Sequence, residues 1–173
     1  MPLPVIRIFG DPVLRTPAEP VTVFDDALAH LAETMIETMY AAPGVGLAAP
    51  QIGVGIRLFV FDTDWDSRDA RVPRRPRLVV NPVLEVGPDV EDGGEGCLSI
   101  PGLTVLTPRA SRARVIGQDL AGGPVEFAGT GELARCLQHE TDHLDGILYI
   151  SRLTGQTRKD AARALRDRGL VPG

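Results

Sequence analysis

The sequence is poor in the features that mark secreted and membrane proteins. Its cysteines are Cys97 and Cys136, too few for the disulfide framework of a small secreted domain. A disulfide between the two is possible on count alone, but reduced thiols are the expectation for a cytoplasmic chain. The chain has no apolar run of the ~20 residues that cross a bilayer, and residues 1–12 resemble neither a signal peptide nor a transit peptide. These absences predict a cytoplasmic protein that does not enter a membrane.

An excess of basic residues is also missing. The chain has 18 basic and 23 acidic residues and a formal net charge of -5, which gives no support to a broad basic face for DNA or other nucleic acid. Its 43% hydrophobic content is ordinary for a soluble globular protein, and its 173 residues suffice for one hydrophobic core. Because no internal repeat or low-complexity tract divides the sequence, we predict a single domain over residues 1–173.

Helical periodicity predicts helices in several places. Over residues 25–41, apolar side chains recur on one stripe, and Ala42-Pro43-Gly44 ends the segment. Helical signals return over residues 131–144, where Gly146 is well placed as the C-terminal cap. A last, charged helix is predicted over about residues 157–168.

Between these helices the pattern is that of short strands. Residues 56–61 form an apolar run typical of a buried strand, and residues 77–80 predict another that ends at Asn81-Pro82. The polar residues 62–76 between them indicate a surface loop. Further strands are expected over residues 103–127, with a hairpin turn at residues 121–123. We therefore predict an α+β fold in which short antiparallel strands pack around a central helix.

That central helix carries the strongest chemical signal, the string His139-Glu140-Thr141-Asp142-His143. At about 100° per residue, the two histidines lie roughly 40° apart on one helical face, so both imidazoles can bind one metal ion. Glu140 projects from the edge of the same arc, too far round to be a ligand but close enough to reach a water bound to the metal. The alternative is a helix whose two histidines are merely partly exposed.

A third protein ligand is needed beside the two histidines. Cys97 is the best candidate, because a thiolate binds divalent transition metals strongly and the adjacent glycines allow the backbone to approach closely. Asp145 and Glu132 are alternatives, and Cys97 could also be a small buried residue. Cys136 lies in an apolar periodic segment, where burial is the expectation.

Three strings in the chain resemble the signature motifs of the peptide deformylase family, in the family's order. They are Gly44-Val45-Gly46-Leu47-Ala48-Ala49-Pro50-Gln51, Glu95-Gly96-Cys97-Leu98-Ser99 and Gln138-His139-Glu140-Thr141-Asp142-His143. The resemblance extends from about residue 6 to about residue 153. It implies a metal-dependent hydrolase that removes the N-formyl group from the first methionine of nascent proteins and releases formate.

The resemblance also implies the ligands of the metal. Cys97, His139 and His143 would hold one divalent ion and leave a fourth position for water. Members of the family use Fe(II) and accept nickel, cobalt or zinc, so Fe(II) is the expected metal. A thiolate ligand is open to oxidation, which predicts a site sensitive to air.

The catalytic roles follow in the same way from the resemblance. Glu140 would be the general base and would later pass the proton to the departing amine. The side-chain amide of Gln51 and the backbone N–H of Leu98 would donate hydrogen bonds to the oxyanion. Gly46 would line the place where the formyl group enters.

Specificity for methionine is expected from an apolar pocket, because an unbranched thioether is recognised mainly by burial. Gly44 and Val45 on the glycine-rich loop, and Cys136 and Leu137 on the metal-binding helix, are the candidate substrate-binding residues. The alternative for Val45, Cys136 and Leu137 is ordinary packing in the hydrophobic core.

Four further residues carry predictions about the surroundings of the site. We predict an ion pair between Arg109 and Asp142, because a carboxylate on a packed helix needs a partner, and we expect Glu95 to brace the site. Many bacterial members of the family have an arginine where this chain has Thr104, which leaves contacts to the second or third substrate residue open.

The charged C-terminal segment allows a further partner, and the HExxH string at residues 139–143 allows other functions. We interpret the last helix as a charged helix exposed to solvent, and the alternative is that it docks to ribosomal RNA. A zinc endoprotease would share the HExxH string. A catalytically inactive binding module would be expected to lack Glu140, Gln51 or Cys97, and all three are present.

Overall fold

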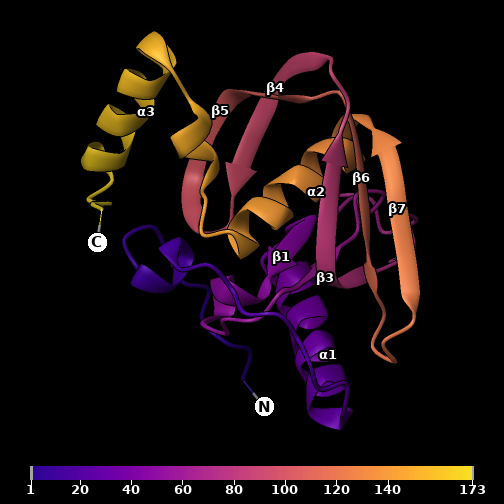
Figure 1. Cartoon of the computed structure of the whole chain (residues 1–173). Coiled ribbons are helices and arrows are strands. Elements are labelled where there is room, and N and C mark those ends of the chain that lie inside the picture. Colours follow the sequence, from indigo (N-terminus) through magenta and orange to yellow (C-terminus); the bar gives the residue numbers. More distant parts are fainter. Residues whose placement is uncertain (1, 173) are drawn as a thin grey trace.

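The computed structural model describes residues 2–172, which form two antiparallel sheets and three α-helices (Figure 1). The larger sheet has the strand order β1-β2-β3-β6-β7, and β4 pairs with β5 in the smaller one. The strands are β1 (Gly46–Ala48), β2 (Leu58–Phe61), β3 (Arg77–Val86), β4 (Val90–Cys97), β5 (Ile100–Ala110), β6 (Arg112–Gln118) and β7 (Pro124–Thr130). The helices are α1 (Asp26–Ala41), α2 (Gly131–Leu144) and α3 (Gly155–Asp167). The α+β prediction is confirmed.

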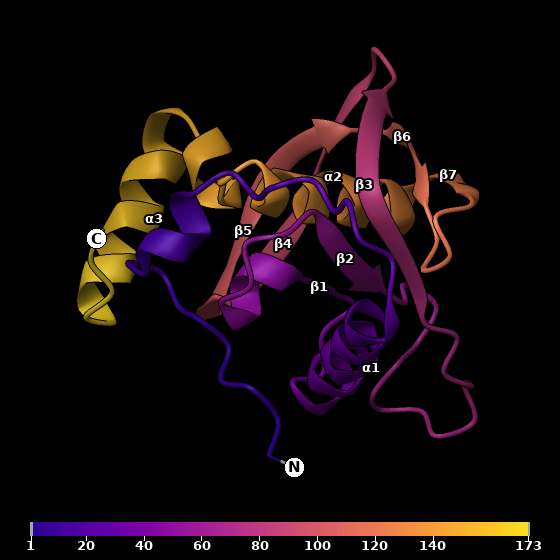
Figure 2. The same cartoon turned by 60° about the horizontal axis from the view of Figure 1, so that its bottom comes forward.

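Helix α2 is the centre of the fold. It packs against strands of both sheets, and the second view shows α1 on the other side of the larger sheet (Figures 1 and 2). Strand β2 lies between the two helices: Leu58 and Val60 pack in the cluster around α1, whereas Phe59 and Phe61 pack in the cluster around α2. Burial on both faces explains why this strand is an unbroken apolar run.

The helix ends follow from local chemistry. The carboxylate of Asp25 caps α1 by accepting a hydrogen bond from the backbone N–H of Leu28 at 3.0 Å. The bounds of α2 are those predicted, and Gly146, directly after the C-cap residue Asp145, has φ +75°. A Cβ at Gly146 would lie 2.7 Å from the carbonyl oxygen of Arg15, so space as well as conformation requires glycine there. Helix α3 begins two residues before the predicted start.

One strand prediction was wrong and one long strand was missed. Asn81-Pro82 does not end β3, which continues to Val86 because the pairing with β6 resumes after a register shift between Val80 and Val83. Asn81 absorbs this bulge with φ 51°, a conformation that asparagine tolerates better than most residues. Strand β4 was not predicted, since its glycines and acidic residues hide the alternation expected of a strand.

None of the helices formed by residues 2–172 is long and apolar enough to span a bilayer.

Candidate active site

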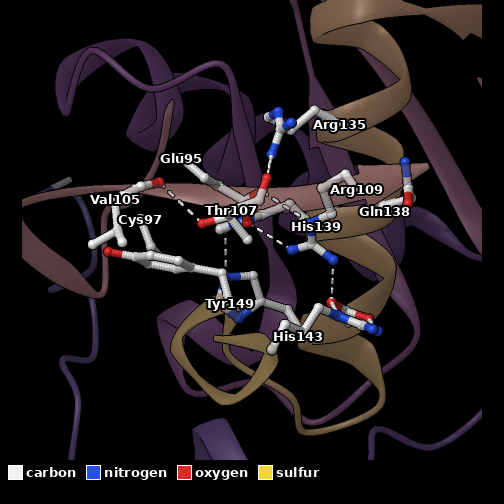
Figure 3. Close-up of polar contacts among 12 residues, drawn as sticks. Glu95, Cys97, Val105, Thr107, Arg109, Arg135, Gln138, His139, His143 and Tyr149 are labelled. Atoms are coloured by element: carbon white, nitrogen blue, oxygen red, sulfur yellow. Dashed lines mark hydrogen bonds and ion pairs between the residues drawn. The ribbon is translucent and has the colours of Figure 1, made fainter. Parts of the chain in front are cut away.

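Cys97, His139 and His143 come together between the smaller sheet and α2 (Figure 3). Cys97 ends β4, and the two histidines lie one turn apart on α2. The Sγ atom of Cys97 is 3.3 Å from Nε2 of His143, which is 3.2 Å from Nε2 of His139. Ligand atoms sharing one tetrahedral ion at bond lengths of about 2.0–2.3 Å stand roughly 3.3–3.6 Å apart, so the three atoms fit a single metal ion.

The two histidines differ in their electrostatic surroundings. Burial lowers the pKa of His143 well below its usual range, which keeps its imidazole neutral as a metal ligand requires. Burial also opposes a charged His139, but Cys97 and Glu95 outweigh it and raise the pKa of His139. Of the alternative ligands, Asp145 pairs with Arg57 at 2.9 Å, and neither it nor Glu132 belongs to the group.

Glu140 is buried beside the metal ligands. Burial raises the pKa of this carboxyl to about 7, and within residues 2–172 its Oε2 atom has no hydrogen-bond partner. Gly46 on β1 faces it so closely that a Cβ there would lie 2.8 Å from Cδ of Glu140 and closer still to Oε1. The missing side chain at Gly46 is therefore what leaves room for the carboxylate.

Gln51 is held with its amide directed at the same place. It lies in a short 3₁₀ helix (Ala49–Ile52), where its Oε1 accepts a hydrogen bond from the backbone N–H of Ala48 at 2.9 Å. This bond fixes the orientation of the side chain, so Nε2 is the atom that faces the site. Nε2 lies 3.1 Å from Oγ of Ser99 and 3.6 Å from Sγ of Cys97. A donor is thus positioned beside the metal ligands.

An open cavity of about 560 Å³ leads to these residues. Its buried floor includes Gln51, Ile100, His139 and Glu140, and its exposed rim includes Pro101, Gly102 and Thr104. The predicted residues Gly44, Val45, Gly46, Leu98 and Cys136 all line it.

Leu137 does not line this cavity. It is completely buried in the hydrophobic cluster between α2 and the larger sheet. On an α-helix Leu137 lies about 160° round from His139, so it points away from the ligand face, whereas Cys136 lies only about 60° from His139. The two neighbours therefore have different environments.

A network of buried charged side chains holds His139 in place. The ion pair between Arg109 and Asp142 is confirmed, with Nη1 2.6 Å from Oδ2. Glu95 accepts hydrogen bonds from Nε and Nη2 of Arg109 at 2.9 and 2.6 Å and lies 2.7 Å from Nδ1 of His139 (Figure 3). Burial opposes the charge on Glu95, but Arg109 and His139 outweigh it and lower its pKa to about 2. The expectation that Glu95 braces the site is borne out by these contacts.

Two arginines of this network were not predicted. Arg135 donates to Glu95 at 3.1 Å and to the carbonyl oxygen of Thr107 at 2.8 Å, and Arg152 binds both carboxylate oxygens of Asp142. Each pairs with a residue of another element, so the local sequence carries no signal for them.

Comparison with known proteins decides the family. A sequence model described as polypeptide deformylase matches residues 4–159. The chain belongs to the polypeptide deformylase family.

Named relatives agree with this membership. The peptide deformylase of Acidothermus cellulolyticus is 54% identical over 162 residues, covering 94% of this chain and 85% of that protein. That of Mycobacterium ulcerans is 52% identical over 180 residues, covering 97% of this chain and 90% of that protein. The crystal structure of the Thermus thermophilus peptide deformylase superposes with a TM-score of 0.85 at 47% identity, covering 95% and 94% of the two chains.

Membership in the family gives the reaction. The enzyme is a metal-dependent hydrolase that removes the N-formyl group from the N-terminal methionine of nascent proteins and releases formate. The zinc endoprotease and the inactive binding module are thereby set aside.

Proposed function

We propose that formyl hydrolysis occurs on the floor of this cavity, with Cys97, His139 and His143 as the metal ligands. The observation that carries the proposal is the convergence of the three ligand atoms beside a buried carboxylate, Glu140. A divalent ion bound there would polarise the formyl carbonyl and lower the pKa of a water molecule. Glu140 takes a proton from the attacking water and passes it to the amine nitrogen as the C–N bond breaks, which yields formate and a free amino terminus.

The oxygen of the formyl carbonyl becomes negative as water adds, and we assign two hydrogen-bond donors to it. These are Nε2 of Gln51 and the backbone N–H of Leu98, which directly follows Cys97. Val45, Gly44 and Cys136 line the space for the methionine side chain, and the raised pKa of the buried Cys136 thiol keeps it uncharged. Leu137 contributes only from the core behind this wall.

Replacing Gln51 by leucine tests the side-chain donor. Because leucine has similar bulk and no donor, we expect kcat to fall by about 10²–10³-fold, the range seen when one oxyanion donor is removed. Formate release from a formyl-Met-Ala-Ser peptide measures the effect. Gln51→Glu can still accept the hydrogen bond from the backbone N–H of Ala48, but it has no Nε2 donor and places a negative charge beside the oxyanion, so its activity should be no higher than that of Gln51→Leu. Activity above a tenth of the parent in Gln51→Leu would contradict the role.

Gly46→Ala tests the space beside Glu140. The added Cβ would displace the carboxylate of Glu140, so we expect a loss of kcat of at least about ten-fold with metal content unchanged, comparable to a misplaced catalytic group. Gly55→Ala is the matched control, because a Cβ at Gly55 meets no atom within 4 Å. Equal activities of the two variants would show that the tight contact at Gly46 has no catalytic importance.

We further propose Fe(II) as the metal in the cell. The support is the thiolate among the ligands, which suits a divalent transition metal, together with the family's use of iron. Elemental analysis after anaerobic purification tests this: iron near one equivalent, with activity lost in air unless nickel is substituted, supports the proposal. Stoichiometric zinc with full activity in air would contradict it.

We also propose that the enzyme acts in the cytoplasm and meets nascent chains at the ribosome, with α3 as the contact. Arg158, Lys159 and Arg163 are exposed on this helix, whereas Leu165 is buried against the body of the protein. Truncation after Leu153 would uncover that core, so reversing the charges of Arg158 and Lys159 is the sharper test. Weaker co-sedimentation with ribosomes supports the contact, and unchanged co-sedimentation disposes of it.

A further inference from the structure

Helix α3 brings a positive charge to the rim of the substrate cavity. Arg168 follows the last residue of α3, where its Nη1 donates a hydrogen bond to the carbonyl oxygen of Ala164 at 3.0 Å. Its Nη2 donates to the carbonyl oxygen of Gly102 at 2.9 Å. The guanidinium therefore bridges α3 and the start of β5, two elements that lie beside each other in both views (Figures 1 and 2).

Gly102 is part of the exposed rim. It lines the cavity between Pro101 and Leu103, and its φ of +77° turns the chain there. A Cβ built on Gly102 would find Nε of Arg168, at 3.7 Å, as its nearest neighbour beyond the adjoining residues. The charge of Arg168 is thus held against the backbone of the rim itself.

This charge has no carboxylate partner among the ion pairs of residues 2–172. Both hydrogen-bond acceptors of Arg168 are carbonyl oxygens, which bind the guanidinium without neutralising it. The rim residue Thr104 is uncharged, and the exposed carboxylate that lines the cavity, Glu132, belongs to α2. A held, uncompensated cation beside a binding cavity attracts anionic groups of the ligand.

The direction of the substrate places its later residues at this rim. The formyl group has to reach the buried floor at Glu140 and His139, so the residues that follow methionine run outward past the exposed rim. We propose that Arg168 is a specificity-determining residue that favours peptides with a carboxylate two residues after the formylmethionine. The inference rests on the cavity floor being the place of formyl hydrolysis. The carboxylate can be an aspartate side chain or the free C-terminus of a short peptide.

Four peptides separate these possibilities. They are formyl-Met-Ala-Asp-amide, formyl-Met-Ala-Ser-amide, formyl-Met-Ala-Lys-amide and formyl-Met-Ala-Ser with a free carboxylate. Arg168→Ala in the full-length, metal-loaded enzyme is expected to lower kcat/KM for the aspartate peptide about three-fold, mainly through KM, because the contact is exposed and does not change during the reaction. Cleavage of the neutral amide should stay unchanged. If kcat/KM for formyl-Met-Ala-Ser with a free carboxylate falls by the same factor, Arg168 recognises the C-terminal carboxylate as well as the aspartate side chain.

Two variants separate charge from structure. Arg168→Lys keeps the charge but loses the two-pronged hydrogen bonding, and we expect it to retain the preference for aspartate. Arg166→Ala removes the same charge two residues away, on a side chain that lines a different groove, and we expect the preference to remain. Raising the ionic strength should weaken the preference in the parent enzyme.

The results that overturn the proposal are distinct from failure of the enzyme assignment. Equal changes for all four peptides in Arg168→Ala would show a structural role only. An equal shift of the preference in Arg166→Ala would show that overall charge is responsible. The parent's activity on the neutral amide reports separately on deformylation.

Discussion

Replacing Glu140 by glutamine is expected to lower kcat for formate release by about 10²–10⁴-fold, the contribution typical of a general acid–base. Glutamine fills the same space against Gly46 but cannot accept the proton of the attacking water. Because Cys97, His139 and His143 are unchanged, metal content should stay at the parent's value. The measurement is formate release from a formyl-Met-Ala-Ser peptide by anaerobically prepared enzyme, with the metal quantified in the same samples.

Glu132→Gln is the matched control for this variant. Glu132 is on the same helix and lines the same cavity, but its side chain is exposed and we assign it no part in proton transfer. Its replacement is expected to change kcat by no more than about two-fold, as for most surface substitutions. If Glu140→Gln kept more than a tenth of the parent's kcat, another group would have to move the proton. Loss of the metal from Glu140→Gln would show that the carboxylate supports the metal site instead.

Helix α1 was predictable from its apolar stripe of helical period, whereas α3 was predicted as a charged helix. The bounds of α2 follow from glycines with positive φ at its two ends, since Gly131 is its first residue and Gly146 follows its C-cap. The strands were less predictable. Strand β4 contains three glycines and acidic residues, and it is recognised only through its pairing with β5, which no local pattern reports.

The site was predictable to the extent that its residues share one element. The spacing of His139 and His143 on a helix implies a common ligand face, and the structure brings Cys97 to it from β4. The choice of Cys97 over Asp145 and Glu132 depended on the family resemblance, since spacing left all three open. Arg135 was missed because its carboxylate partner, Glu95, is distant in the sequence. Helical geometry alone would have removed Leu137 from the cavity wall.

The second large effect is expected from Glu95→Gln, which should destabilise the folded enzyme by about 3–5 kcal/mol, the usual consequence of breaking a buried ion pair. The side chain of Glu95 is only 4% exposed, and its carboxylate accepts hydrogen bonds from both Arg109 and Arg135. Without its charge, the two buried guanidinium groups face a neutral amide. For a chain of this size, each kcal/mol corresponds to about 2–4 °C, so Tm should fall by roughly 10 °C.

The same substitution should weaken metal binding about 10–100-fold, because Glu95 orients His139 through Nδ1. Glu126→Gln is the matched control. Its carboxylate binds Arg114 through the same two-pronged geometry, at 2.7 and 3.0 Å, but on the exposed surface. There solvent and salt screen the pair, so Tm and metal binding should be nearly those of the parent. Thermal melting and competition with a metal chelator measure the two effects.

The comparison between these two variants separates burial from hydrogen-bond geometry. If Glu95→Gln were as stable as Glu126→Gln, desolvation of the buried charges would already balance their attraction, and the network would serve orientation alone. In that case the loss of metal affinity should persist without the fall in Tm. If neither property changed, Arg109 would be held by Asp142 alone, and His139 would keep its orientation without a carboxylate behind it.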